Sequence, residues 1–351
     1  MQIAPITNKY HNAANITSPK LGFAGVGWIG RSRLEAIAQH TNATIAAVFD
    51  PAESAINQSK THYENIQTAT SFEHLLTLDL DGIVIATPSA LHEQQTLQAL
   101  EKGLPVFCQK PLARTAEATR RLVEKAREKN VLLGVDFSYR DALALQKVNE
   151  LIKHDTIGEM FHANLIFHNA YGPDKSWYYD PALSGGGCVM DLGIHLVDML
   201  FYLFPDLKIK HIRSHLYNKG KLICNTQSNI EDFATVQIGF ENDGSAQLTC
   251  SWNVSAGQDA VIEATFFGTK GGICFKNVNG SFYDFQTELY HGTSKNIIIA
   301  PPDEWMGRTA ALWAMQLADN PSFDESALTY IKVAETLDRI YNIAENKIHE
   351  S

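Results

Sequence analysis

The sequence predicts an α/β fold in two parts: a doubly wound parallel sheet, then a domain built on an antiparallel sheet with one buried face. Three observations support this prediction. The chain has 351 residues, which at ~150 residues per domain favours two domains. Short apolar runs alternate with amphipathic, helix-like segments up to about residue 135. Beyond that point, apolar and polar residues alternate one by one.

Helix-like segments separate the candidate buried strands of the first half, and two of these segments have recognisable ends. One helix begins after Ser89 and ends at Gly103, a glycine of the C′ type that is followed by Pro105. Another begins at the N-cap residue Thr115 and runs to about Asn130. Buried runs separated by helices indicate a parallel sheet with crossover helices. The strand candidates are 21–25, 44–49, 82–86, 106–108 and 131–135.

The second half has the period of two that is typical of a sheet with one buried face. Apolar residues fall at every second position in 161–168, 234–240 and 246–252, with Phe161 among the residues expected to point inward. A helix at about 187–203 interrupts these strands. We place the domain boundaries as follows: 1–19 a loosely ordered tail, 20–139 the first domain, 140–325 the second and 326–351 a C-terminal helix.

Composition narrows the class of protein. Hydrophobic residues make up 45% of the chain and charged residues 19%, so a large core can form and disorder over most of the length is excluded. Lysine and arginine total 29 against 39 acidic residues. The formal net charge is therefore −10, which argues against nucleic acid as a partner.

The cysteines and the N-terminus bear on location. The five cysteines are odd in number and none forms a CxxC pair, so a reducing compartment is favoured over a disulfide framework or a structural zinc site. Residues 1–20 lack the apolar core of a secretory signal, and no apolar run approaches the ~20 residues of a membrane span. We expect a cytoplasmic protein without a membrane partner.

The sequence Gly25-Val26-Gly27-Trp28-Ile29-Gly30 follows the first apolar run and opens a helix-like segment. In this pattern the first glycine permits a tight turn and the second lets the backbone approach a pyrophosphate. The third lets the helix pack closely on the strand. The helix N-terminus then offers free N–H groups to the phosphates. We predict that this turn, Trp28 and Ile29 included, binds a dinucleotide; the alternative is a glycine-rich turn without a ligand.

Asp50 ends the next apolar run, 20 residues beyond Gly30. At this spacing an acid accepts hydrogen bonds from the adenosine ribose hydroxyls and repels a 2′-phosphate, so NAD is favoured over NADP. The alternative is an N-cap aspartate before Pro51.

Two further groups of residues carry chemistry. Lys110 follows the run 106–108, and ligands of an open parallel sheet lie beyond the carboxyl ends of its strands. Asp191, His195 and Asp198 have the spacing i, i+4 and i+7, which predicts one face of an otherwise apolar helix. A histidine there can move a proton near neutral pH. The alternatives are a solvated lysine, a hydrogen-bonded core histidine and, with less support, a metal site.

Four motifs in this order resemble the glucose–fructose oxidoreductase/inositol dehydrogenase/rhizopine-catabolism family, often written Gfo/Idh/MocA. They are Gly25 to Gly30 with Asp50; Thr87-Pro88-Ser89-Ala90-Leu91-His92; Gln109-Lys110-Pro111; and Gly185 to Asp198. The resemblance covers the chain from Leu21 to the final helix. It implies a Rossmann domain and a C-terminal α/β domain with a large, mainly antiparallel, open sheet. It also implies a homodimer or homotetramer formed through that sheet.

The resemblance implies roles for individual residues. Lys110, Asp191 and His195 would surround the reacting carbinol: His195 accepts its proton, Lys110 stabilises the developing oxygen charge and Asp191 orients the substrate or His195. Thr87 and Pro88 would line the nicotinamide ribose. Further residues assigned to the cofactor site are His92, for which a structural role has more support than a catalytic one, Gln109 and Lys110 itself.

Some positions depart from the family pattern or carry weaker hypotheses. Gln109 stands where the family usually has glutamate, and Ser89 where it has asparagine. Arg140 is a candidate substrate ligand or, equally, a structural residue. A loop with Asp174, Trp177, Tyr178 and Tyr179 suits a sugar ring, with a packed loop as the alternative.

These observations predict an NAD(P)-dependent dehydrogenase that oxidises a carbinol of a sugar, an inositol or a related polyhydroxylated ring. Two alternatives stay open. One is an enzyme that retains NAD and uses transient oxidation for epimerisation, elimination or glycoside cleavage. The other is a cofactor-binding sensor without turnover, against which the intact set of Lys110, Asp191 and His195 argues.

Overall fold

The computed structural model describes residues 18–61, 63, 65–223, 226 and 229–346. The predicted tail at 1–19 falls outside this part of the chain except for its last two residues. The last five residues of the predicted C-terminal helix and Cys224 fall outside it as well.

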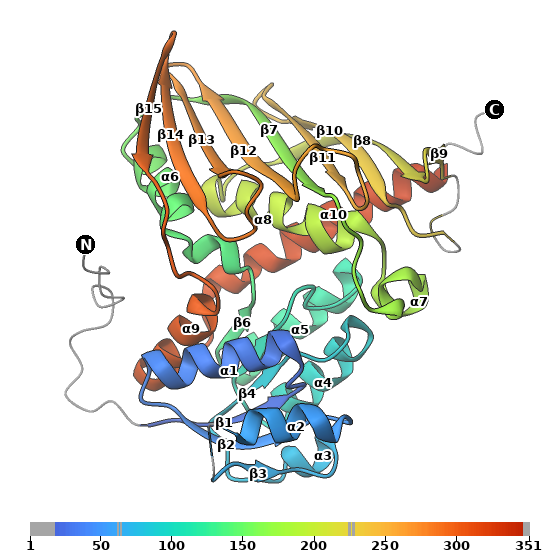
Figure 1. Cartoon of the computed structure of the whole chain (residues 1–351), viewed down its shortest axis with the longest axis vertical. Helices are drawn as coiled ribbons and strands as arrows, with labels where there is room; N and C mark the ends of the chain where they lie inside the picture. The colour runs from blue at the N-terminus through green and yellow to red at the C-terminus, as the bar shows by residue number, and fades with distance from the viewer. Residues whose placement is uncertain (1–17, 62, 64, 224–225, 227–228, 347–351) are drawn as a thin grey trace.

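The N-terminal half forms a six-stranded parallel sheet in the order β3-β2-β1-β4-β5-β6, with the chain reversing its direction of travel across the sheet between β1 and β4 (Figure 1). Five of its strands match the apolar runs of the sequence to within two residues. The two residues of β3 are too few to leave a periodic signal. The strands are β1 (Lys20–Ala24), β2 (Thr44–Phe49), β3 (Gln67–Thr68), β4 (Gly82–Ile85), β5 (Val106–Cys108) and β6 (Leu133–Val135).

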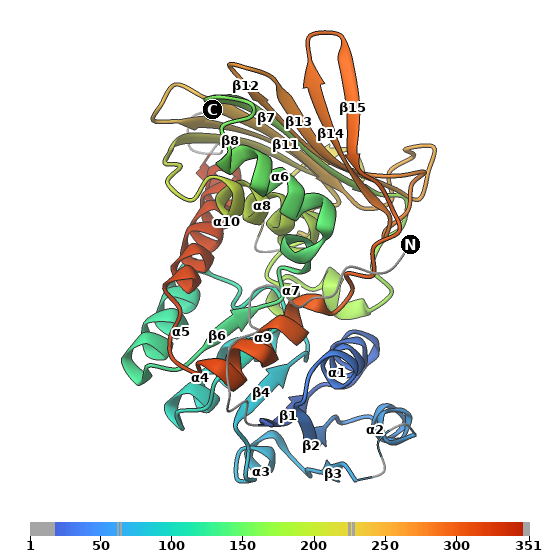
Figure 2. The same cartoon turned by 90° about the vertical axis from the view of Figure 1, so that its left-hand side faces the viewer.

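Helices cover both faces of this sheet. On one face, α1 and α9 bury Leu34 and Trp313 together with Phe23 of β1; on the other, α3, α4 and α5 pack into the main core. α9 belongs by sequence to the range assigned to the second domain, yet it packs against the first sheet (Figure 2). The helices are α1 (Trp28–His40), α2 (Glu53–Lys60), α3 (Phe72–Leu75), α4 (Ser89–Glu101), α5 (Ala116–Lys129) and α9 (Arg308–Asp319).

The C-terminal half forms a nine-stranded sheet in the order β15-β14-β13-β12-β7-β11-β10-β8-β9. Every neighbouring pair is antiparallel except β7 and β11, which run parallel. The sheet is therefore large, open and mainly antiparallel, as the sequence predicted. The strands are β7 (Met160–Asn169), β8 (Ile209–Asn218), β9 (Lys221–Leu222), β10 (Phe233–Phe240), β11 (Ser245–Ser251), β12 (Ala260–Gly268), β13 (Gly272–Asn277), β14 (Phe285–His291) and β15 (Ser294–Ile299).

The predicted alternation holds along most of these strands, but Phe161 was placed wrongly. Its side chain is 55% exposed, whereas Met160 is buried. A register irregularity between Phe267 and Gly268 of β12 shifts the pairing at this end of β7, so the regular inward positions begin only at Ala163.

Helices cover one face of the large sheet, the face that looks toward the first domain (Figures 1 and 2). The stretch Pro181–Leu203 is long and apolar enough, by length and composition, to cross a membrane, but 83% of its most apolar window is buried inside the fold. It is thus a core element of the fold. The helices on this face are α6 (Leu143–Lys153), α8 (Ile194–Leu203) and α10 (Leu328–Asn346), whereas the short α7 (Pro181–Ser184) packs beside α4.

Candidate active site

The glycine turn between β1 and α1 has the geometry of a phosphate-binding loop. Gly25 has a φ of +85°, and a Cβ there would lie 2.6 Å from the Ala86 carbonyl. A Cβ on Gly30 would lie 2.0 Å from the Gly25 oxygen, whereas one on Gly27 would meet nothing within 4 Å. The open space therefore lies at the N-terminus of α1. The first turn of α1 has no acidic residue, and Gly27 offers no capping side chain, which leaves N–H groups free for an anion.

Asp50, at the end of β2, fastens this turn. Its Oδ2 accepts a hydrogen bond from the Val26 N–H at 2.8 Å, and its Oδ1 accepts one from Ala52, also at 2.8 Å. Each carboxylate oxygen can accept a second hydrogen bond. Asp50 can thus brace the loop and still receive ribose hydroxyls, so the two interpretations of this residue are compatible.

Asp50→Ala is expected to raise the Kd for NAD by about tenfold or more, because hydrogen bonds to a charged group contribute about 1.5–3 kcal/mol. The Kd for NADP should rise less, since the lost charge also repelled the 2′-phosphate. Titration of both cofactors, followed by protein fluorescence, measures the two effects. Asp50→Asn removes the negative charge but keeps an oxygen that can accept the Val26 N–H. It therefore distinguishes the effect of the charge on cofactor binding from the effect of holding the turn in place. Equal weakening of both cofactors would contradict the assignment.

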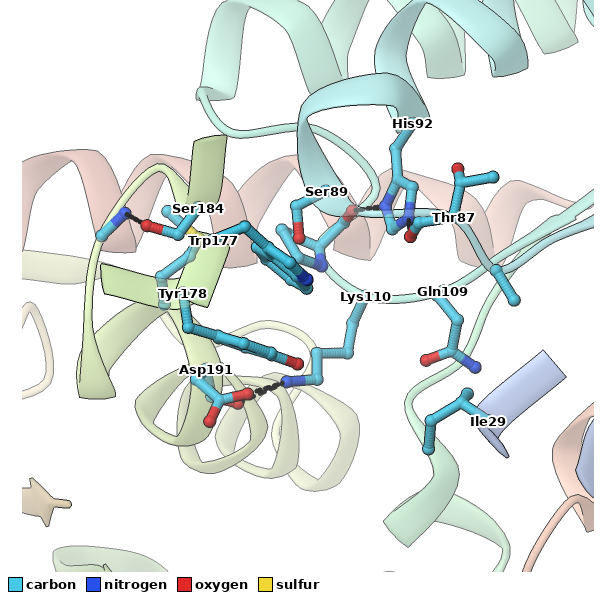
Figure 3. A pocket seen from close by; sticks show the side chains of 14 residues that line it. Ile29, Thr87, Ser89, His92, Gln109, Lys110, Trp177, Tyr178, Ser184 and Asp191 are labelled. Carbon is cyan, nitrogen blue, oxygen red and sulfur yellow. Dashed lines mark hydrogen bonds and ion pairs between the residues drawn. The ribbon is translucent and has the colours of Figure 1, made fainter. Parts of the chain in front are cut away.

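Two hollows meet at Lys110, beyond the carboxyl ends of β4 and β5, and together form what we call the cleft. The first chamber lies between these strand ends and the loop that carries Trp177 and Tyr178 (Figure 3). The second chamber extends toward Arg33 and His195. Ile29, Gln109 and Lys110 line both chambers. The first chamber is also lined by Ala86, Thr87, Ser89, His92, Pro111, Ser184, Gly186, Met190 and Asp191, and the second by Trp28, Asp136, Ser138, Tyr139, Phe282, Tyr283, Trp305 and Met306.

The structure brings Lys110 and Asp191 into direct contact. The Lys110 Nζ lies 2.6 Å from Asp191 Oδ1 and 2.7 Å from the Asp191 backbone oxygen (Figure 3). The other carboxylate oxygen accepts a hydrogen bond of 3.1 Å from the indole N–H of Trp252, which is 2% exposed. Both oxygens of Asp191 are therefore held, and a third proton of the ammonium group is left for a ligand.

The predicted polar face of Asp191, His195 and Asp198 does not form, because the helix does not begin as an α-helix. Residues Val189–Gly193 form a π-turn, in which the Ile194 N–H bonds to the Val189 oxygen five residues earlier, and α8 follows. This extra residue changes the angle between Asp191 and the residues after it, and such turns are frequent at functional sites. Asp191 contacts Lys110, whereas Asp198 pairs with Arg140.

His195 lines the second chamber and is held by packing instead of a carboxylate. Its ring meets Tyr139 edge-on at 5.0 Å between centroids and is 8% exposed. Neither ring nitrogen has a hydrogen-bond partner among the residues that the structure describes. Burial lowers the pKa of His195 well below its usual value of 6.5, and the positive charges of Lys110 and Arg33 lower it further. The imidazole is therefore neutral at physiological pH and able to accept a proton.

Several predicted residues of the Thr87 motif hold the cleft wall together. Both ring nitrogens of His92 lie 2.7 Å from backbone oxygens, those of Pro111 and Thr87. His92 thus links the ends of two strands, which agrees with its expected structural role. Thr87 donates a hydrogen bond of 2.6 Å to Gln95, and Pro88 precedes the first residue of α4.

The candidate substrate ligands divide into two groups. Trp177 and Tyr178 line the first chamber, with their rings stacked at 3.9 Å between centroids. Arg140 is not among the residues that line either chamber; its guanidinium donates to both oxygens of Asp198. Asp174 is 80% exposed in its side chain, pairs with Lys175 and does not line the cleft either. Within the described ranges, no three histidine, cysteine, aspartate or glutamate residues gather as metal ligands.

Comparison with known proteins agrees with this geometry. The family model described as "Oxidoreductase family, NAD-binding Rossmann fold" matches residues 20–137, and the model "GFO/IDH/MocA C-terminal domain" matches residues 145–274. The chain belongs to the Gfo/Idh/MocA family. Its first domain is thus an NAD-binding Rossmann domain, and the predicted fold class is confirmed.

Two relatives share about a quarter of their aligned residues with this chain. D-glucoside 3-dehydrogenase of Escherichia coli (strain K12) is 28% identical over 235 residues, which is 63% of this chain and 67% of that protein. Glucose-6-phosphate 3-dehydrogenase of Bacillus subtilis (strain 168) is 26% identical over 299 residues, 82% of this chain and 84% of that protein. The solved structure of levoglucosan dehydrogenase in complex with NADH has the same fold, with a TM-score of 0.79, 18% identity and coverage of 94% of this chain and 98% of that chain.

The structure accounts for Gln109, where the Gfo/Idh/MocA pattern usually has glutamate. The Gln109 amide nitrogen donates to Oδ2 of Asp136, a carboxylate at the end of β6. The same oxygen accepts a hydrogen bond of 2.6 Å from Arg33 Nε, and both ionic side chains are almost fully buried. A carboxylate is thus present beside position 109 but belongs to Asp136. A second one at 109 would face it directly.

Gln109→Glu is expected to lower the free energy of unfolding by about 1–3 kcal/mol at pH 7, because two buried carboxylates would share one arginine. The double variant Gln109→Glu/Asp136→Asn places the carboxylate at position 109 and the amide at position 136. It should recover most of the lost free energy of unfolding. Thermal unfolding checks both, since 1 kcal/mol shifts the melting temperature by ~2–4 °C in domains of about 150–250 residues. Wild-type stability of the single variant would show that Asp136 does not occupy the place of the family's glutamate.

Some residues of the site could not be found by the sequence analysis. Trp252, Arg33 and Asp136 reach it from three separate elements, and none belongs to a motif. Glu231 is another: it is fully buried and its Oε1 accepts the N–H groups of Gly187 and Val189, at 2.9 and 3.0 Å. This carboxylate caps the start of the π-turn that presents Asp191. The run of glycines before the helix was the one available signal, since a Cβ on Gly187 would lie 2.0 Å from the Glu231 backbone oxygen.

Proposed function

We propose that this chain is an NAD-dependent dehydrogenase that oxidises a carbinol of a sugar, an inositol or a related polyhydroxylated ring. The observation that carries the proposal is the juxtaposition at Lys110. An ammonium group bound to Asp191 and a neutral, unbonded imidazole of His195 line one cleft, at the carboxyl edge of a dinucleotide-binding sheet. Membership of an NAD-binding oxidoreductase family supports the redox reaction.

The residues of the cleft divide the work of removing a proton. NAD, when bound, supplies the acceptor for the hydride that leaves the carbinol carbon. His195 accepts the hydroxyl proton, for which its lowered pKa keeps the ring deprotonated. Lys110 stabilises the negative charge that develops on the oxygen, and Asp191 with Trp252 holds Lys110 in place. Because neither oxygen of Asp191 contacts His195, its task is to position Lys110 and the substrate.

The names of the relatives support a carbohydrate substrate. D-glucoside 3-dehydrogenase and glucose-6-phosphate 3-dehydrogenase both bear the name of a sugar, one without and one with a phosphate group. The pair Trp177 and Tyr178 adds support, because aromatic faces pack well against the C–H faces of a sugar ring. The relatives leave open whether the substrate carries a charge.

A panel of sugars, glycosides and inositols, incubated with excess NAD and followed by NADH absorbance, tests the proposal. We expect NADH to accumulate over many turnovers with at least one compound. Isomerised or cleaved product without net NADH would indicate the alternative, in which NAD stays bound through the cycle. Binding of NAD without any reaction in either direction across the panel would favour a sensor.

We further propose a cytoplasmic homodimer or homotetramer assembled through the large sheet. One face of that sheet has no helices over it in the described part of the chain (Figures 1 and 2). This face is more polar than a simple hydrophobic interface, since it carries residues such as His162, Gln247 and Arg213; apolar exposure concentrates at the edges, as at Ile297. Light scattering at micromolar concentration should give at least twice the monomer mass; a monomer would contradict the assembly.

A further inference from the structure

The fixed positive charges that line the cleft are already neutralised. Among the described residues that line the two chambers, the lysine and arginine residues are Lys110, which lines both, and Arg33, which lines the second. Lys110 lies 2.6 Å from Asp191, and Arg33 lies 2.6 Å from Asp136. The formal charge of these four side chains sums to zero. An anionic ligand would therefore meet a carboxylate beside each cation, and the attraction of the cation would be offset by that like charge.

The histidines of the lining do not supply a further cation for a ligand. Both ring nitrogens of His92 are directed at backbone oxygens, so neither is left for a ligand, and burial lowers the pKa of this histidine. His195 is neutral, because burial and the nearby cations lower its pKa.

One hydrogen-bond acceptor of the second chamber, close to Arg33, has no partner in the described part of the chain. Asp136 is 1% exposed, and its Oδ1 has no hydrogen-bond partner among the described residues. A buried carboxylate oxygen without a donor is costly, so it favours a ligand that brings an O–H or N–H group. A phosphate or a carboxylate at the same place would meet like charge instead.

The aromatic wall of the first chamber also favours an uncharged ligand. The stacked rings of Trp177 and Tyr178 face Lys110 and Asp191 in Figure 3. An aromatic wall contributes contact area without a charge and so stabilises the C–H face of a neutral ring. Hydroxyl groups at the ring edge can then reach Asp191 and Lys110.

We infer that the substrate held in this cleft is uncharged: a polyhydroxylated ring or glycoside that carries no phosphate or carboxylate group. The inference rests on the proposed function only in taking this cleft as the substrate site. It goes further by excluding sugar phosphates and sugar acids, which the family relationship leaves open.

Calorimetric titration of the protein saturated with NADH tests the inference without any turnover. The probes are two matched pairs, methyl glucoside with its 6-phosphate and myo-inositol with its 1-phosphate. For at least one pair the neutral member should bind, and its phosphate should bind at least about tenfold more weakly. Tighter or equal binding of the phosphate in that pair, or no binding of either neutral compound, would overturn the inference.

Two variants identify the cause of the discrimination. Asp191→Asn removes the partner of Lys110 and should narrow the ratio of the two Kd values by about tenfold or more. Asp79→Asn removes an equally charged partner, that of Lys20, on the exposed surface away from the cleft and should leave the ratio unchanged. An unchanged ratio in Asp191→Asn would also count against the inference. If the neutral ring binds but NAD is not reduced, the proposed dehydrogenase function fails while the inference holds.

Discussion

His195→Ala is expected to lower kcat for oxidation by ~10²–10⁴-fold while the Kd for NAD stays within about twofold of wild type, because general-base catalysis contributes in that range. The histidine lines the second chamber and is not part of the glycine turn, so its loss falls on the transition state. Steady-state kinetics and a separate NAD titration measure the two quantities. His40→Ala, at the exposed end of α1, is the matched control and should leave both kcat and the Kd for NAD unchanged.

The pH dependence gives a second readout of the same residue. A base acts in its deprotonated form, so activity is lost as the pH falls through its pKa. Because burial and the nearby cations hold the pKa of His195 well below 6.5, the acid limb of the kcat profile should lie below pH 6.5. Near-normal turnover in His195→Ala would make this histidine structural, and Lys110 would become the next candidate for the base.

Lys110→Met is expected to cost about 10²–10³-fold in kcat, since it removes the positive charge beside the developing alkoxide. It also leaves the Asp191 carboxylate without its ion-pair partner, although Trp252 still donates to Oδ2. Lys129→Met, an exposed substitution at the end of α5, controls for the change of residue type. Retained activity in Lys110→Met would remove the lysine from the proposed mechanism.

The losses of kcat in His195→Ala and Lys110→Met should not be independent of each other. Lys110 and His195 act on the same oxygen, so the loss in the double variant should be smaller than the product of the single losses. Loss of the lysine should also raise the pKa of His195 toward 6.5, since one cause of its depression is gone. The acid limb of Lys110→Met is therefore expected to move to higher pH. An unmoved limb would mean that the titrating group is not His195.

The local parts of the fold were predictable because short-range signals determine them. Thr115 caps α5 as its sequence position suggested, with its hydroxyl accepting from Ala118, and β2 and β5 match their apolar runs at both ends. The glycine turn was predictable for a similar reason, because its pattern is local: a Cβ on Gly30 would meet the Gly25 oxygen of the same turn. The neighbour of Gly25 is Ala86, after β4, and this contact has no signal in the sequence.

The chemistry of the cleft was predictable only in part, because it depends on contacts between distant segments. The spacing of Asp191 and His195 predicted a shared helix face, but a π-turn capped from Glu231 cannot be deduced from helical periodicity. The bond from Trp252 to Asp191 joins the end of β11 to that turn. The pairing of Arg33 with Asp136 spans 103 positions in the sequence, and no motif marks it.

The return of α9 to the first sheet has a consequence for how this protein can be divided. Trp313 and Leu317 of this helix sit over Gly134 and Gly82, where a Cβ would come within 2.7 and 2.8 Å of them. The space that side chains would occupy at those strand positions is filled by Trp313 and Leu317, which lie 179 and 235 residues later in the chain. The nucleotide-binding domain is therefore not complete without α9. If it were expressed as residues 20–139 alone, one face of its sheet would expose an apolar groove where α9 packs in the full chain. Any chimera that exchanges substrate domains within the family has to transfer α9 with the half it completes.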